Sequence, residues 1–126
     1  MTVLAVFLGS ALGASARRIV DHSVTRLAGG RFPWGTLVIN VSGSLILGVV
    51  LGLSARTTSA TALWWTVLLG TGFCGGFTTF STFAFETVRL SEENRSRGAV
   101  TNVAMSVVFG LAAVAVGWQL ATTALH

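Results

Sequence analysis

The chain has 126 residues, of which 52% are hydrophobic and only 10% are charged, and it contains eight arginines, four acidic residues and no lysine. A soluble domain carries roughly 25% charged residues, so this composition excludes a water-soluble globular protein. The net charge of +4 reflects scarce acidic residues rather than a basic patch, and it gives little support to nucleic-acid binding. The single cysteine, Cys74, excludes a disulfide framework and a multi-cysteine metal site.

Four apolar stretches predict an all-α membrane protein with four transmembrane helices. A helix needs about 20 mostly apolar residues to cross a bilayer. The short gaps between the stretches predict neighbouring antiparallel helices in one domain, residues 1–126. The four predicted spans are residues 2–20, 34–55, 61–85 and 98–121.

The first span has a second interpretation as a secretory signal peptide. It ends in Ala14-Ser15-Ala16, which resembles a cleavage site. No positive charge precedes the apolar run, however, and no soluble domain follows it. We therefore expect a transmembrane helix.

The arginines are distributed unevenly between the predicted loops. The regions after spans one and three share one side of the membrane and hold seven of the eight arginines, while the opposite side holds only Arg56. Arginine-rich loops stay in the cytoplasm. This bias predicts that both termini lie outside.

The third span contains the least helix-compatible segment of the chain. Gly75-Gly76 is followed by Thr78-Thr79, and glycine pairs and β-branched residues weaken a helix. We expect this helix to be broken near mid-membrane, where freed carbonyls must be satisfied by protein, water or an ion. Carbonyl oxygens are hard ligands suited to a small cation. A kink that serves packing alone is the alternative.

Two aromatic rings and two hydroxyls follow the expected break. Phe80 and Phe83 are three residues apart and share one face of a helix. Such a pair is ordinarily a core or lipid contact, but ring edges carry partial positive charge and can face an anion. Ser81 and Thr82 add hydroxyl donors beside them.

These residues lie in blocks that resemble the Fluc/CrcB family of fluoride channels, and the likeness covers essentially the whole chain. Gly13-Ala14-Ser15-Ala16-Arg17 is similar to the family's GAxxR motif. The segment from Gly35 to Ser44 resembles GTLxVNxxGS, and Gly72 to Phe83 resembles GFCGGxTTFSTF, which is long and specific.

The resemblance implies a passive fluoride-selective channel in the cell membrane that lets accumulated fluoride leave the cell. It implies an antiparallel (inverted) dimer of four-helix subunits in membrane lipid, with a structural sodium ion that is not transported. The implied sodium ligands are the backbone carbonyls of Gly75 and Thr78. The expected fluoride path includes Asn40, Phe80, Phe83, Ser81, Thr82, Ser106, Arg17 and Glu86.

Three positions depart from the family pattern: Arg18, Asn102 and Gly110. The arginine bias also conflicts with one chain inserting in both orientations, so the dimer is either a homodimer or a pair with an oppositely oriented paralogue. Two other functions remain as alternatives. A small multidrug exporter would need an acidic residue in the first span, where there is none. A non-conducting membrane subunit would leave the broken helix unexplained, and no residue pattern indicates an enzyme.

Overall fold

Four long helices make up the computed structural model, which describes residues 2–56 and 59–123. They are α1 (Thr2–Ala28), α2 (Trp34–Ser54), a helical segment over Ala60–Glu92, and α6 (Ser96–Thr123). Each is long and apolar enough to cross a membrane. The prediction of an all-helical, multi-pass membrane protein with four spanning helices is therefore confirmed.

The segment Ala60–Glu92 is divided into successive helical parts. It comprises α3 (Ala60–Thr66), the π-helical turns η1 (Val67–Cys74), the short α4 (Gly75–Phe77) and α5 (Phe80–Glu92). Thr78 and Thr79, between α4 and α5, have extended backbone angles, with ψ of 163° and 120°. The helical ladder thus stops at the threonines, whereas Gly75 and Gly76, expected to weaken it, remain helical.

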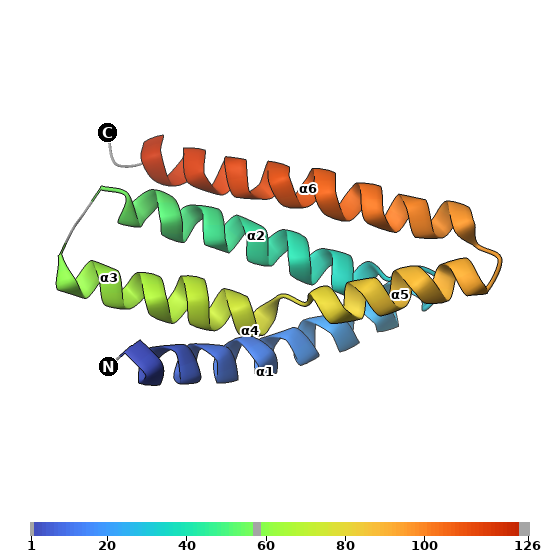
Figure 1. Ribbon diagram of the computed structural model, residues 1–126, viewed down its shortest axis with the longest axis horizontal. Coiled ribbons are helices and arrows are strands. Elements are labelled where there is room, and N and C mark those ends of the chain that lie inside the picture. The colour runs from blue at the N-terminus through green and yellow to red at the C-terminus, as the bar shows by residue number, and fades with distance from the viewer. Residues whose placement is uncertain (1, 57–58, 124–126) are drawn as a thin grey trace.

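The helices run up and down as a single antiparallel set (Figure 1). Both described chain ends, the end of α2 and the start of α3 lie at one end of the molecule. The loop from α1 to α2 and the turn from α5 to α6 lie at the other end. The two arginine-rich regions are therefore on the same side, as their sequence order requires.

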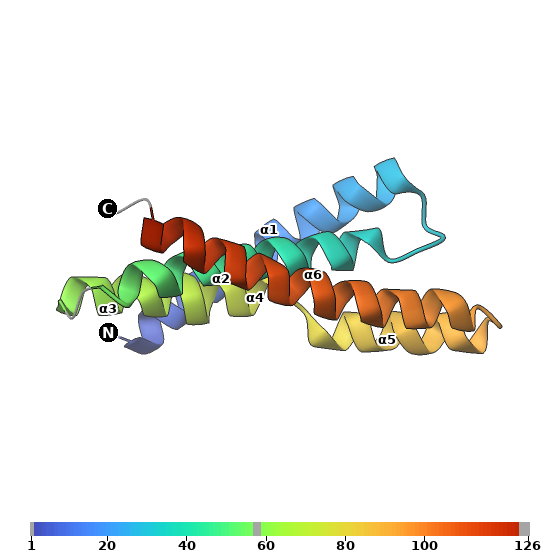
Figure 2. The same ribbon diagram turned by 90° about the horizontal axis from the view of Figure 1, so that it is seen from above.

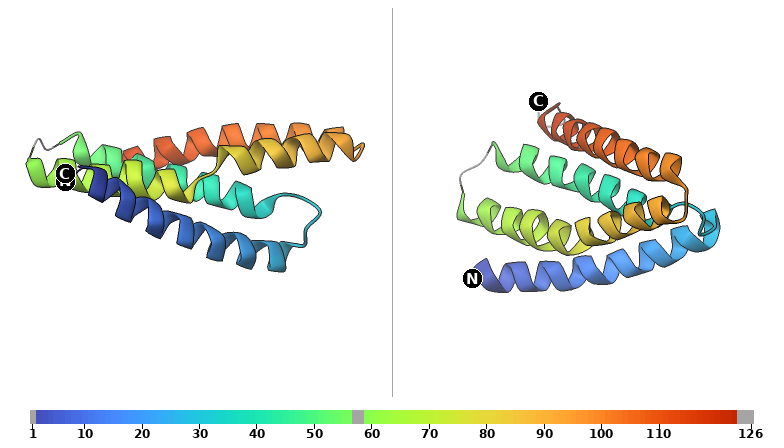
Figure 3. Two further views of the ribbon diagram at one scale, coloured as in Figure 1. Left: turned by 60° about the horizontal axis from the view of Figure 1, so that its bottom comes forward. Right: turned by 45° about the vertical axis from the view of Figure 1, so that its right-hand side comes forward.

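Packing divides the molecule into two tight pairs of helices. α2 packs along α6, and α1 packs along η1 and α4 (Figure 3). A Cβ added at Gly76 would lie 2.7 Å from the Cα of Ser10, so only glycine permits this approach of α4 to α1. Toward its C-terminus α1 diverges from α5 and α6 (Figure 2).

Two helices extend beyond their apolar stretches. α1 continues to Ala28 rather than ending near residue 20, and α5 continues to Glu92 rather than ending near residue 85. The turn after α5 places Asn94 at φ 58°, and the Arg95 amide donates to the Leu90 carbonyl at 2.9 Å. Asparagine tolerates this left-handed conformation, which ends the helix.

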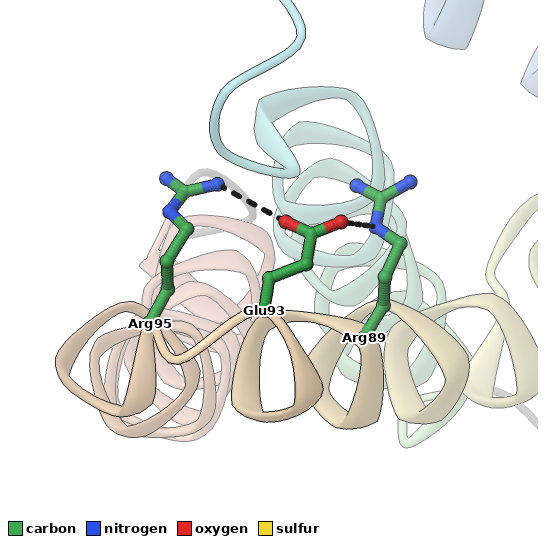
Figure 4. A network of polar contacts seen from close by, with 3 residues as sticks. All are labelled: Arg89, Glu93 and Arg95. Carbon is green, nitrogen blue, oxygen red and sulfur yellow. Dashed lines mark ion pairs between the residues drawn. The ribbon is translucent and has the colours of Figure 1, made fainter.

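Glu93 forms two ion pairs at this turn (Figure 4). Its carboxylate oxygens lie 3.8 Å from Arg89 Nε and 3.8 Å from Arg95 Nη1. All three side chains are about half exposed. Solvent therefore screens the pairs, and each contributes at most about 1 kcal/mol.

Candidate functional site at the α4–α5 junction

Thr79 organises the junction between α4 and α5. Its Oγ1 accepts a hydrogen bond from the Thr82 amide at 3.2 Å and thereby caps the first turn of α5. The same hydroxyl donates to Thr82 Oγ1 at 3.0 Å and lies 3.4 Å from Ser81 Oγ. The Thr82 hydroxyl proton is thus left available for another acceptor.

Asn40 on α2 holds the junction from the opposite side. Its Nδ2 donates to the Thr79 carbonyl at 3.0 Å, and its Oδ1 accepts from the Thr79 amide at 2.8 Å. A primary amide has two N–H donors, so one N–H of Asn40 remains for another partner. Asn40 therefore fixes the backbone of the junction and also presents a donor there.

The carbonyl groups of Gly75 and Thr78 have both lost their usual helical donors. The Thr79 amide, four residues after Gly75, donates to Asn40, and the Thr82 amide, four residues after Thr78, donates to Thr79 Oγ1. Arg17 Nη1 on α1 donates to the Thr78 carbonyl at 3.3 Å. The Thr78 carbonyl therefore accepts from a cationic side chain.

A pocket of about 420 Å³ opens between α2, η1 and the junction. It brings together four of the residues predicted from the sequence, with Thr79 at their centre. Those four residues are Asn40, Gly75, Thr78 and Phe80. Cys74 is buried in the wall of this pocket, in keeping with a packing role.

A second pocket of about 270 Å³ lies between α1, α2 and the start of α5. It is lined by Arg17, Arg18, Asp21, Thr36 and Thr82, among others. Thr79 lines both pockets. The second pocket thus places Arg17 and Arg18 on the same cavity as Thr79 and Thr82 of the junction.

The two phenylalanines lie side by side after the junction. Their ring centroids are 5.8 Å apart and the ring planes are inclined by 48°. The Phe80 side chain is 79% exposed, whereas Phe83 is only partly exposed. Such exposure is unremarkable against lipid, but it also leaves the Phe80 ring available to a partner or an ion.

Four of the residues predicted from the sequence line neither pocket: Ser81, Phe83, Glu86 and Ser106. Glu86 lies beside Thr36, with Asp21 and Arg89 near enough for electrostatic interaction. Its buried Oε2 has no hydrogen-bond partner among the described residues. The same holds for Ser106 Oγ on α6.

Sequence reasoning missed Thr79, Thr36 and Asp21 as site residues. The signal for Thr79 was present in the sequence, because threonine is among the residues preferred at the N-cap of a helix. Asp21 and Thr36 come from different helices, and only the packing of α1 against α2 brings them together. Among the described residues, no group of three His, Cys, Asp or Glu side chains is arranged to hold a metal ion.

The fold and this junction define a class: a four-helix, multi-pass membrane protein whose polar groups converge where the third helical segment is interrupted. Residues 4–118 match the profile of the family described as "CrcB-like protein, Camphor Resistance (CrcB)". The chain belongs to this family, which confirms the resemblance drawn from its motifs.

Its relatives include several proteins with one shared name. The "Fluoride-specific ion channel FluC 2" of Mycolicibacterium paratuberculosis is 46% identical over 96% of this chain and 98% of the relative. The protein of the same name from Rhodococcus jostii is 45% identical over 95% and 98%. The "Fluoride-specific ion channel FluC" of Methylocella silvestris is 42% identical over 96% and 93%.

Proposed function

We propose that this protein is a fluoride-selective channel that passively carries fluoride out across the cell membrane. The observation that carries the proposal is the similarity, over nearly the whole chain, to relatives named fluoride-specific ion channels. No acid–base or nucleophilic group is needed for such a function. The protein's task is to replace the water around a small, strongly hydrated anion.

The junction supplies suitable groups for that task. The free N–H of Asn40 and the hydroxyls of Thr82 and Ser81 are neutral donors, and the Phe80 and Phe83 ring edges add weak positive potential. Neutral groups bind an anion loosely enough for it to leave, as conduction requires. Arg17 at the mouth would attract fluoride without trapping it inside. Ser106 and Glu86 are proposed to lie farther along the path.

Structural sodium is the second part of the proposal. The chemistry of the Gly75 and Thr78 carbonyls fits a hard cation, because neither receives its usual helical donor. Sodium would supply positive charge to these oxygens and tie the junction together. A protein that binds sodium in its folded state gains stability from it. Thermal unfolding in detergent should therefore occur at higher temperature in sodium than in N-methylglucamine, and equal unfolding temperatures would contradict the site.

The working unit is proposed to be an antiparallel dimer. Phe80 is 79% exposed beside the open pocket at the junction, and a second subunit on that face would complete an enclosed path. The asymmetric arginines favour one insertion orientation. This specific observation supports the alternative that the chain is a subunit that conducts only with an oppositely oriented paralogue.

Fluoride efflux from liposomes containing only the purified chain tests the function, with chloride as the matched control. Fluoride-selective efflux supports the channel and a working homodimer. Efflux that appears only after co-reconstitution with a paralogue supports the paired channel. Absence of fluoride efflux in both preparations contradicts the proposed function.

A further inference from the structure

Asp21 is the only acidic residue that lines the pocket at the arginine-rich mouth, within the part of the chain that the structure describes. It lies one helical turn after Arg17 on α1 and shares the 270 Å³ pocket with Arg17 and Arg18. Among the described residues, no ion pair joins Asp21 to either arginine. The Asp21 charge therefore contributes to the electrostatic potential of the whole pocket and is not paired with one arginine.

The packing of α1 on α2 holds the carboxylate in place. Asp21 Oδ1 lies so close to Gly35 that a Cβ at position 35 would collide with it. Gly35 is in the first turn of α2, where Pro33 provides no side-chain cap. The N-terminus of a helix favours a negative charge, so the start of α2 is a favourable position for the Asp21 carboxylate beside the pocket.

We propose that Asp21 sets the electrostatic potential of this mouth and limits how fast fluoride enters it, an inference that rests on the proposed channel function. Arg17 and Arg18 raise the local anion concentration, and the Asp21 carboxylate opposes them. The potential at the mouth is thus set by charges of opposite sign, and the net attraction of an anion is weaker than the arginines alone would produce.

The sign and size of the effect follow from Coulomb's law. Removing one charge that lies about 5 to 10 Å from an anion in a water-like medium changes the local concentration of the anion about two- to fourfold. Added salt screens such an effect. Asp21→Asn should therefore raise the initial fluoride efflux rate about two- to fourfold at an ionic strength of about 10 mM, and much less at about 300 mM.

The test uses fluoride efflux from liposomes with the full-length chain, or with the paralogue pair if only that conducts. Glu92→Gln is the matched control, because it removes an exposed carboxylate that does not line the pocket. Asp21→Glu keeps the charge and should retain the wild-type rate. Arg18→Gln changes the potential in the opposite sense and should lower the rate about twofold at low ionic strength. It keeps the inference testable if Asp21→Asn fails to fold.

The inference is overturned if Asp21→Asn leaves the rate unchanged, lowers it, or raises it equally at both ionic strengths. It is also overturned if Glu92→Gln raises the rate as much, or if Arg18→Gln has no effect. In all these cases the wild-type protein still conducts, so the channel function stands. Absence of fluoride efflux from the wild-type protein and from the pair removes both proposals together.

Discussion

The two sides of the α4–α5 junction are built in opposite ways. Before the junction, η1 and α4 pack so closely on α1 that backbone meets backbone, as at Gly76 against Ser10. After it, α5 begins with a side-chain cap, and its Phe80 and Phe85 are 79% and 66% exposed. One side is fixed by packing within the chain, and the other presents polar and aromatic groups outward.

This difference indicates that the parts of the segment Ala60–Glu92 before and after the junction have different roles. Close packing before the junction anchors the position of Gly75 and Thr78 relative to α1, and the Asn40 hydrogen bonds set where α5 starts. The outward side chains of α5 are then held at a defined place without being buried. Changes before the junction should therefore affect folding, and changes at or after it should affect flux.

The largest effect should come from Gly76→Ala. The added methyl would meet the backbone of Ser10, which cannot move aside as a side chain would. We expect the free energy of unfolding to fall by about 3 kcal/mol or more. This should be measured as a large decrease in the thermal unfolding temperature in detergent. Gly75→Ala is the matched control, because a Cβ there has nothing within 4 Å in the subunit. Equal stability of the two variants would contradict the packing argument.

Phe80→Ile should act on the other side of the junction and reduce flux without unfolding the protein. Isoleucine fills similar space but has no positive ring edge for an anion. A difference of about 1.4 kcal/mol in the barrier corresponds to about a tenfold slower efflux. Phe85→Ile, on the same helix but outside both pockets, should conduct normally. If both variants conduct like wild type, Phe80 is not part of the fluoride path.

Glu93→Gln should have the smallest effect. Glu93 follows the C-terminal end of α5 and lines neither pocket. The substitution removes the half-exposed ion pairs to Arg89 and Arg95, and such pairs contribute little. We expect a stability change below about 1 kcal/mol and normal flux. A large decrease in unfolding temperature would show that the turn depends on these charges.

The four spanning helices could be predicted from the sequence, because a helix that crosses the bilayer needs about 20 mostly apolar residues. The apolar stretches do not give the ends of the helices, because α1 and α5 continue beyond them. Within the segment expected to be irregular, the residues with extended backbone angles are Thr78 and Thr79. Gly75 and Gly76 stay helical, and close packing on α1 requires a glycine at position 76.

The candidate site was only partly accessible from the sequence. Motif positions identified Asn40, Phe80 and Thr82, yet they gave no indication that both ends of the Asn40 amide bind the Thr79 backbone. Asp21 and Thr36 were missed because their proximity depends on how α1 crosses α2. Pairings of that kind come from tertiary packing, which no single segment encodes.

The proposed fluoride path runs through the Asn40–Thr79 junction, and fluoride efflux through the Asn40→Asp variant tests that position of the path. Aspartate loses the donor to the Thr79 carbonyl and places a negative charge beside the path. Asn94→Asp, in the turn after α5, is the control. We expect Asn40→Asp to abolish fluoride efflux from liposomes and Asn94→Asp to conduct. Both variants should elute from size-exclusion chromatography as folded protein. Wild-type efflux through folded Asn40→Asp protein would contradict the claim.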